Sequence, residues 1–141
     1  MSVEIETKSA GDNTVYGGVV AYLTLSDAAA AGEFYKQAFG AEEIRRHAAE
    51  DGKRLLHLHL KINGGSLFLM DAFPEWGVPY QDPQGCMLHL QVDDIEAWWK
   101  RATAAAGVEV KMEPQDMFWG DRYGQLKDPF GISWSMGMTP Q

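Results

Sequence analysis

Two stretches of the chain share one pattern of hydrophobic and polar positions. The first, VAYLTLSDAAAAGEFYKQAFGAEE, begins at Val20, and the second, MLHLQVDDIEAWWKRATAAAGVEV, begins at Met87. Each pattern predicts an alternating strand, an aspartate, a helical run that ends at a glycine, and a further extended segment. Asp27 and Asp94 are 67 positions apart (94 − 27), and so are Gly40 and Gly107 (107 − 40). The spacing therefore predicts two copies of one module.

Each copy is expected to contain one helix. The first helix begins near Ser26 and Asp27 and stops at Gly40, and its inward residues are Phe34, Ala38 and Phe39. In the second helix Asp93 and Glu96 form a pair like a capping box, and Gly107 suits a left-handed position after the helix. The apolar stripe of this second helix is Ile95, Trp98, Ala102 and Ala105. This stripe favours Trp98 as a core residue over a platform for a ligand.

Strand signals follow each helix. In the first copy we expect strands at 41–50, 54–62 and 66–70, around the Asp51-Gly52 and Asn63-Gly64-Gly65 turns. In the second copy we expect strands at 108–113, 117–126 and 131–136, so each module is βαβββ. The stretch 71–85 between the copies is rich in proline and aromatic residues. A lid, an interface and a plain connecting strap are all open interpretations of it.

Composition narrows the class of protein. The chain has 141 residues, 45% hydrophobic and 23% charged, with a net charge of −8 and no cluster of Lys and Arg. That composition is ordinary for a globular domain and argues against a partner made of nucleic acid. No apolar run approaches the ~20 residues of a membrane span, and the first residues lack the apolar core of a signal peptide, so we expect a cytoplasmic protein. Cys86 is the single cysteine, and a packing role is expected for it.

Paired βαβββ modules with Asp-Pro-Phe-Gly before the last strand resemble the vicinal oxygen chelate superfamily, and within it the PhnB-like branch. This superfamily includes glyoxalase I, extradiol dioxygenases, fosfomycin-resistance enzymes and bleomycin-resistance proteins. The resemblance runs from Val19 to Met136 and is carried by AYLTLSDAAAAGEFYKQAFGAEE, LHLQVDDIEAWWKRATAAAGVEV and WGDRYGQLKDPFGISWS. It implies an α+β fold in which two four-stranded sheets form an incomplete barrel, with helices outside and a ligand cavity inside.

The resemblance also sets the expected domain organisation and assembly. We expect a single domain over 1–141, with module one at about 16–72, a linker at 73–85 and module two at about 86–137. Relatives in the superfamily commonly pair, and the linker aromatics and five tryptophans suggest apolar surface that needs a partner. We therefore expect a homodimer with an interface of about 1,000 Å² or more.

Alternation along the strands predicts which side chains face the cavity. In LLHLHLKI the apolar set Leu56, Leu58, Leu60 and Ile62 suits the helices, and the opposite set suits the cavity. The same reasoning on all strands gives Tyr22, Thr24, His57, His59, His89, Gln91, Ser133 and Ser135. A solvated sheet face remains the alternative for His57 and His59. His89 is the predicted key polar group and candidate catalytic residue, and Tyr22 is its equivalent in the repeat.

Three further residues are placed by their segments. Trp119 is predicted to form an aromatic wall with Tyr123, and Arg122 is predicted either to hold a hairpin by a salt bridge or to enter the pocket. His47 follows Arg45 and Arg46 in a charged segment, so we expect it to be exposed.

Metal-using relatives take ligands from the first and last strands of each module. The resemblance places these positions at Val20, at Phe68 or Leu69, at Met87 and at Ser135. None of these is a suitable ligand, so we expect no resident metal and no other cofactor. The fallback is a divalent metal held by His57, His59 and His89.

Three functions of different classes follow. The first is binding of a small organic molecule without a metal. The second is a glyoxalase-like lyase or isomerase with a displaced site or an acid–base site built on His89. The third is a non-catalytic interaction protein. The fold alone does not decide among them, since one fold hosts many functions.

Overall fold

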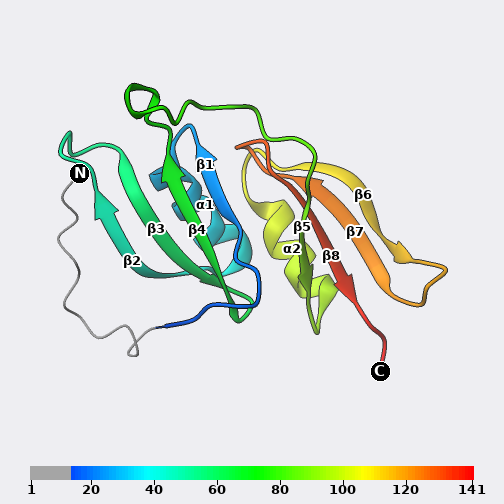
Figure 1. The fold of residues 1–141 in the computed structure, drawn as a ribbon. Coiled ribbons are helices and arrows are strands. Elements are labelled where there is room, and N and C mark those ends of the chain that lie inside the picture. The colour runs from blue at the N-terminus through cyan, green and yellow to red at the C-terminus, as the bar shows by residue number, and fades with distance from the viewer. Residues whose placement is uncertain (1–13) are drawn as a thin grey trace.

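The computed structural model describes residues 14–141, which form two four-stranded sheets with one helix each (Figure 1). The first sheet has the strand order β1 (Tyr22–Leu25), β4 (Gly65–Asp71), β3 (Leu55–Ile62) and β2 (Glu42–Ala48). The second has the order β5 (Leu88–Gln91), β8 (Ser133–Met138), β7 (Arg122–Lys127) and β6 (Glu109–Asp116). The helices are α1 (Ala28–Phe39) and α2 (Ile95–Ala104), and a short 3₁₀ helix, η1 (Pro74–Trp76), lies in the connection between the sheets.

The two sheets are copies of one another, which confirms the predicted repeat and the α+β fold. In each sheet the first strand pairs in parallel with the last strand of its module, and the other pairs are antiparallel. Tyr22 is the register partner of Phe68, and His89 is the register partner of Ser135. Both members of the second pair lie 67 positions after their counterparts in the first (89 − 22 and 135 − 68).

Helix α1 begins and ends where the sequence predicts. The carboxylate of Asp27 accepts a hydrogen bond from the Ala30 amide at 3.0 Å, and Gly40 ends the helix in the left-handed conformation with φ 67°. Phe34, Ala38 and Phe39 are buried as expected.

Helix α2 corrects two expectations. Its N-cap is Asp94, which accepts from the Ala97 amide at 3.1 Å, rather than Asp93. The buried residues Ile95, Trp99 and Ala102 follow the i, i+4, i+7 spacing of one helix face, so Trp99 rather than Trp98 enters the core. Trp98 is only partly buried, and the guanidinium of Arg101 lies 4.6 Å from its ring centroid.

The hairpin of β6 and β7 differs from the prediction more than any other strand pair. Strand β6 reaches Asp116 rather than 113, β7 begins at Arg122 rather than 117, and β8 covers 133–138 rather than 131–136. The end of β6 and the start of β7 are displaced by a turn at 117–121, where the Met117 amide donates to the Asp121 carbonyl oxygen at 2.9 Å and Gly120 has φ 103°. The other strands lie within one to two residues of their expected bounds.

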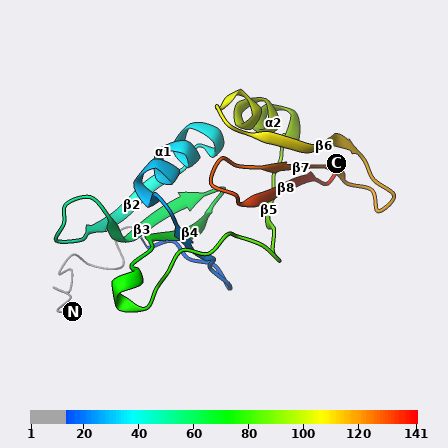
Figure 2. The same cartoon turned by 90° about the horizontal axis from the view of Figure 1, so that it is seen from above.

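Both helices lie on one side of the sheets, and the opposite sheet faces are open (Figure 2). The sheets stand side by side with β1 and β5 as neighbouring edges (Figure 1), and the Asn63 side-chain amide donates to the Gln91 carbonyl oxygen at 2.8 Å. The core lies between helices and sheets, where Tyr35, Leu58, Leu60 and Met136 are fully buried. No closed barrel forms within residues 14–141, so the polar side chains expected inside a cavity stand on an open face instead.

A buried carboxylate is one of the groups that hold the second module to the first. Asp128, in the Asp-Pro-Phe-Gly corner, accepts hydrogen bonds from the Tyr35 hydroxyl on α1 and from the Trp134 indole N–H on β8. It also accepts from the amides of Phe130 and Ile132, which fixes where β8 starts. Over the part of the chain described here, neither helix is long and apolar enough to cross a membrane.

Candidate functional site

The open face of the first sheet carries a cluster of rings. Tyr22 comes from β1, His57 and His59 from β3, and Phe68 from β4. The Phe68 ring centroid lies 5.3, 4.8 and 4.9 Å from those of Tyr22, His57 and His59. The four rings therefore form one continuous surface of flat, largely apolar groups with polar edges.

Hydrogen bonds fix both histidines of this cluster. The Tyr22 hydroxyl lies 2.8 Å from His57 Nδ1, and the Ser66 hydroxyl lies 2.7 Å from His59 Nε2. His59 is only 5% exposed and His57 is partly buried. A solvated position is therefore wrong for His59, and for partly buried His57 it stays an alternative.

A small hollow opens beside the ring cluster, and we call it the histidine pocket. Its volume is about 120 Å³. The residues that matter to its chemistry are Tyr16, Arg45, His47, His57, His59 and Phe68. Arg45 and His47 enter from β2, because Arg45 is the register partner of His59 and His47 is the register partner of His57. His47 is partly buried, so the expectation that it is exposed is wrong.

Sequence reasoning missed Arg45, Tyr16 and Phe68 as pocket residues. Strand alternation did not indicate Arg45, because a bulge between Glu43 and Arg45 lets Ile44 and Arg45 both line the pocket. Pairing that strand across the Asp51-Gly52 turn brings Arg45 and His47 against the two histidines of β3. Tyr16 precedes the first strand, and its ring stacks on His59 with centroids 5.6 Å apart, which no strand pattern indicates.

The charged groups that shift the pKa values of the two β3 histidines are all positive. Burial lowers the pKa of His57 below its ordinary value, and the positive charges of His47, His59 and Arg45 lower it further. Burial also lowers the pKa of His59, and Arg45 adds to that effect. Both imidazoles are therefore neutral near pH 7, where the guanidinium of Arg45 is the positive charge beside them.

The open face of the second sheet carries a chain of hydrogen-bonded side chains. His89 Nδ1 lies 2.7 Å from the Ser135 hydroxyl, and His89 Nε2 lies 2.8 Å from Gln91 Oε1. The Gln91 amide nitrogen donates to the Thr139 hydroxyl at 2.9 Å and to an Asp121 carboxylate oxygen at 3.4 Å. Alternation thus placed His89, Gln91 and Ser135 correctly on one face.

The direction of this chain shows that Nε2 of His89 carries a proton. A carboxylate only accepts, so the Gln91 nitrogen faces Asp121, and the Gln91 oxygen must accept from His89 Nε2–H. In a neutral imidazole Nδ1 then accepts from the Ser135 hydroxyl. Ser135 is only 2% exposed, so it is a support for His89 and not a nucleophile that a substrate can reach.

His89 itself is exposed and lines neither of the two hollows described here. Tyr123 stacks on it with centroids 6.0 Å apart, and Trp119 lies 5.5 Å from Tyr123. The rings of Trp119 and Tyr123 are in contact, and their role as an aromatic wall of a ligand site stays a prediction. The catalytic or binding role of His89 stays a prediction.

Arg122 stands apart from the other predicted site residues. Its guanidinium bonds to Glu96 at 2.7 Å and to Asp116 at 3.3 Å, so it ties α2 to the β6–β7 hairpin. Of the two roles that the sequence leaves open for Arg122, the structure shows the salt-bridged one. Ser133 is partly buried, and its register partner is Lys127.

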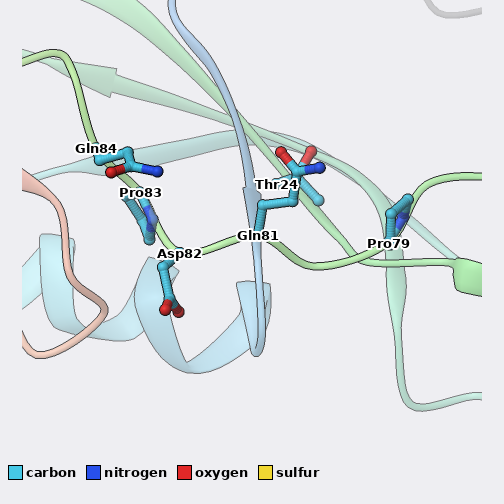
Figure 3. Close-up of a pocket in the computed structure, with 6 residues that line it drawn as sticks. All are labelled: Thr24, Pro79, Gln81, Asp82, Pro83 and Gln84. Atoms are coloured by element: carbon cyan, nitrogen blue, oxygen red, sulfur yellow. The ribbon is translucent and has the colours of Figure 1, made fainter.

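Thr24 lines a second, wider hollow beside the connection between the sheets (Figure 3). Its volume is about 710 Å³, and its lining is Thr24, Pro79, Gln81, Asp82, Pro83 and Gln84. All of these but Thr24 belong to the connection, and Asp82 is the one charged residue among them. This hollow is larger than the histidine pocket but offers less chemistry, since it has no rings of the sheet face and no imidazole.

The donors present do not fit the metal site that the resemblance implies. Where the first and last strands of each module pair, Tyr22 lies opposite Phe68 and His89 lies opposite Ser135. Tyr22 and His89 follow the expected ligand positions Val20 and Met87 by two residues. Only His89 among them is a usual ligand of a divalent metal, and both its ring nitrogens are hydrogen-bonded. His57 and His59 lie on the other sheet from His89, and no three His, Cys, Asp or Glu side chains within residues 14–141 are placed to hold an ion.

Comparison with known proteins defines the class to which this fold belongs. Residues 18–136 match the family model described as the Glyoxalase/Bleomycin resistance protein/Dioxygenase superfamily. The chain therefore belongs to this superfamily, as the motifs of the two modules suggest.

Individual relatives agree with that membership. An uncharacterised protein of Mycobacterium bovis is 41% identical over 122 residues, which cover 82% of this chain and 79% of that protein. A crystal structure of a Pseudomonas aeruginosa protein has a TM-score of 0.71 at 24% identity, over 87% of this chain and 98% of that one. The PhnB protein of Bacillus cereus has a TM-score of 0.67 at 15% identity, over 87% of this chain and 100% of that one. The two structural matches show a shared fold.

Proposed function

We propose that this chain is a PhnB-like member of the superfamily that binds a small organic molecule on the polar sheet faces, without a resident metal. The observation that carries the proposal is the ring cluster of Tyr22, His57, His59 and Phe68 on the first sheet. Ligand sites combine apolar and aromatic walls with a few fixed polar groups, and this cluster supplies both. The fold shared with the Bacillus cereus protein supports the choice of branch.

We also propose that the ligand is covered when two copies of the chain associate. A bound small molecule usually loses 70–90% of its surface to the protein, roughly, and an open sheet face cannot provide that alone. Several rings on or near the open faces are exposed, among them Tyr16 at 51%, Tyr22 at 50% and Trp119 at 49%. A second copy supplies the missing wall if its own open face is laid against these rings.

A ligand screen with two variants tests the binding proposal. Anionic, neutral and cationic small molecules are screened by thermal shift, and each hit is titrated by calorimetry against Phe68→Ser and Tyr22→Phe. Loss of the Phe68 ring should weaken binding roughly tenfold or more, because this ring contacts the rest of the cluster. Val110→Ser is the control, since Val110 is 41% exposed on β6 of the second sheet and belongs neither to the ring cluster nor to the exposed rings of the 117–121 turn.

Two results would overturn the proposal. One is the absence of saturable binding by any molecule in the screen, which would favour an interaction protein. The other is equal affinity of the hits for the parent chain and for Phe68→Ser.

Elemental analysis of the untagged protein tests the claim about metal. The donor set predicts no stoichiometric divalent ion. About one zinc, nickel, manganese or iron ion per chain, lost in His89→Ala, would contradict it.

An enzyme with His89 as acid or base is the second candidate. The Ser135–His89–Gln91 chain favours it, because a supported imidazole with a defined tautomer can move a proton near neutral pH. If a screened ligand is turned over, His89→Asn should abolish turnover while leaving its binding within about threefold. Unchanged turnover in that variant would exclude His89 from the chemistry.

A further inference from the structure

The charge of the histidine pocket is opposite to that of the whole chain. The net charge of the chain is −8, yet the ionisable side chains that line the pocket are Arg45, Tyr16 and three histidines. No carboxylate within residues 14–141 lines it. Potentials of exposed charges fade over ~8 Å at physiological salt, so the pocket's own groups determine what it attracts at close range.

Arg45 is the one arginine without a side-chain or backbone partner among the described residues. Arg46, Arg54 and Arg122 pair with carboxylates, and Arg101 bonds to a backbone oxygen and lies on an indole ring. Arg45 is partly buried in the pocket, and no such contact is made to it. A guanidinium offers a planar fork of donors that matches an oxyanion.

The histidines add donors that point to the same class of ligand. His57 uses Nδ1 toward the Tyr22 hydroxyl, and His59 uses Nε2 toward the Ser66 hydroxyl. When each hydroxyl donates, the other ring nitrogen carries the proton of the neutral imidazole and is a donor. The lowered pKa of both rings agrees with a positive surrounding that lacks an anion.

The walls of the pocket indicate the body of the ligand. The Tyr16 ring stacks on His59 with an angle of 13° between the planes, and Phe68 meets both β3 histidines edge-on. The volume of about 120 Å³ equals that of roughly four waters in the liquid, enough for one oxyanionic group and a small part of a ring. The rest of a flat molecule would lie over the ring cluster toward Tyr22.

We propose that the histidine pocket binds the oxyanionic head group of a small organic acid with a flat apolar body, and that Arg45 is its main charge partner. The inference rests on the proposed function and names the ligand class of the same face. Carboxylate and phosphonate head groups share the required chemistry.

The experiment compares matched probes and matched variants. Benzoate and phenylphosphonate are titrated by calorimetry at pH 6.5 and low salt, beside benzamide as the neutral match and benzamidinium as the cationic one. Arg45→Gln is compared with Arg46→Gln. Both variants lose the same charge one position apart on β2, but Arg46 pairs with Glu43 and does not line the pocket.

At least one of the two anions should bind saturably, and the stronger of them identifies the head group. Benzamide and benzamidinium should bind roughly tenfold more weakly or not at all, and Arg45→Gln should weaken the anion roughly tenfold or more. Arg46→Gln should change the affinity less than about threefold.

Three results would overturn the inference. They are equal binding of benzamide and of the stronger anion, an unchanged affinity of that anion in Arg45→Gln, and no saturable binding of either anion. If neutral or cationic molecules from the wider screen still bind in a way that depends on Phe68, the proposed function stands and only the ligand class fails. If nothing binds, both fail.

Discussion

Buried Asp128 joins α1 of the first module to β8 of the second, and its loss should cost more than that of any one of its bonds. Asp128 is 3% exposed and accepts from the Tyr35 hydroxyl at 2.5 Å and the Trp134 indole at 2.9 Å, besides two backbone amides. Asp128→Ala leaves these buried donors without an acceptor and should lower the free energy of unfolding by roughly 3–5 kcal/mol. Urea denaturation measures this loss in the free energy of unfolding.

Tyr35→Phe is the control for that prediction. It removes one hydrogen bond and no acceptor, so its cost should be roughly 1–2 kcal/mol. Equal losses in the two variants would show that the corner at Asp128 does not depend on its other three donors.

The lowered pKa of His57 predicts that the fold becomes less stable as the pH is lowered. Tyr22, Phe68, His47, Arg45 and His59 surround this ring, and burial followed by the positive neighbours lowers its pKa. The unfolded chain, with a histidine pKa of about 6.5, therefore binds more protons than the folded chain. The part of the stability that depends on neutral His57 is fully present above about pH 6.5, and it is lost as the pH drops from that value toward the lower pKa of the folded chain.

Thermal unfolding between pH 7.5 and 5.5 checks this sign. The melting temperature of the parent should fall over the range, and His57→Gln should reduce the fall. An equally steep dependence in His57→Gln would assign the effect to other groups.

At the level of the elements, strand β7 needs a glycine at one place. A Cβ atom on Gly124 would lie 2.9 Å from the Trp99 ring and 3.1 Å from backbone atoms of Met112 and Pro114. Backbone cannot move away as a flexible side chain can, so Gly124→Ala should destabilise the fold by roughly 1–3 kcal/mol. Chemical denaturation measures the change.

Gly65→Ala is the matched control on a strand. A Cβ atom there would meet nothing closer than 3.9 Å, and the φ of Gly65 is not positive. Its cost should stay within about 0.5 kcal/mol. A cost as large as that of Gly124→Ala would mean that the loss reflects strand propensity and not crowding.

The sequence predicted the elements whose signals are local. Asp27 and Gly40 mark both ends of α1, and the alternation of His57 and His59 with leucines gives the two faces of β3, because one face is buried. It was wrong where neighbouring residues offer competing local signals. The turn at 117–121 shifted β7, and an N-cap one residue later turned Trp99 rather than Trp98 to the core.

Part of the candidate site was predictable, because strand alternation is a local signal. Tyr22, His89, Gln91 and Ser135 follow from strand alternation alone. Arg45 and His47 depend on the register between β2 and β3, which has bulges at 43–45 and 47–48, so the charged segment alone indicated only exposure.

At the level of the whole molecule, the open faces predict a homodimer. Phe118 is 95% exposed, and Trp119 and Met87 are 49% and 43% exposed, all near the open face of the second sheet. A partner that covers such rings should bury about 1,000 Å² or more in total. Sedimentation should give a species of twice the 15.7 kDa chain mass.

Replacement of the hairpin rings tests where the partner binds. Phe118→Ser together with Trp119→Ser should weaken the dimer, because it removes two large apolar contacts. A monomer at micromolar concentration in the parent protein would contradict the predicted assembly.

Ligand mapping by NMR shows whether a small organic molecule binds on the polar sheet faces. Amide and imidazole resonances of the labelled protein are followed during titration with each molecule that passes the thermal-shift screen. The largest shifts should fall on β1, β3 and β4 around Tyr22, His57 and Phe68, with no comparable shifts on α1 and α2. Shifts confined to the helices or to the connection at 79–84, or no shifts at saturating ligand, would contradict the account.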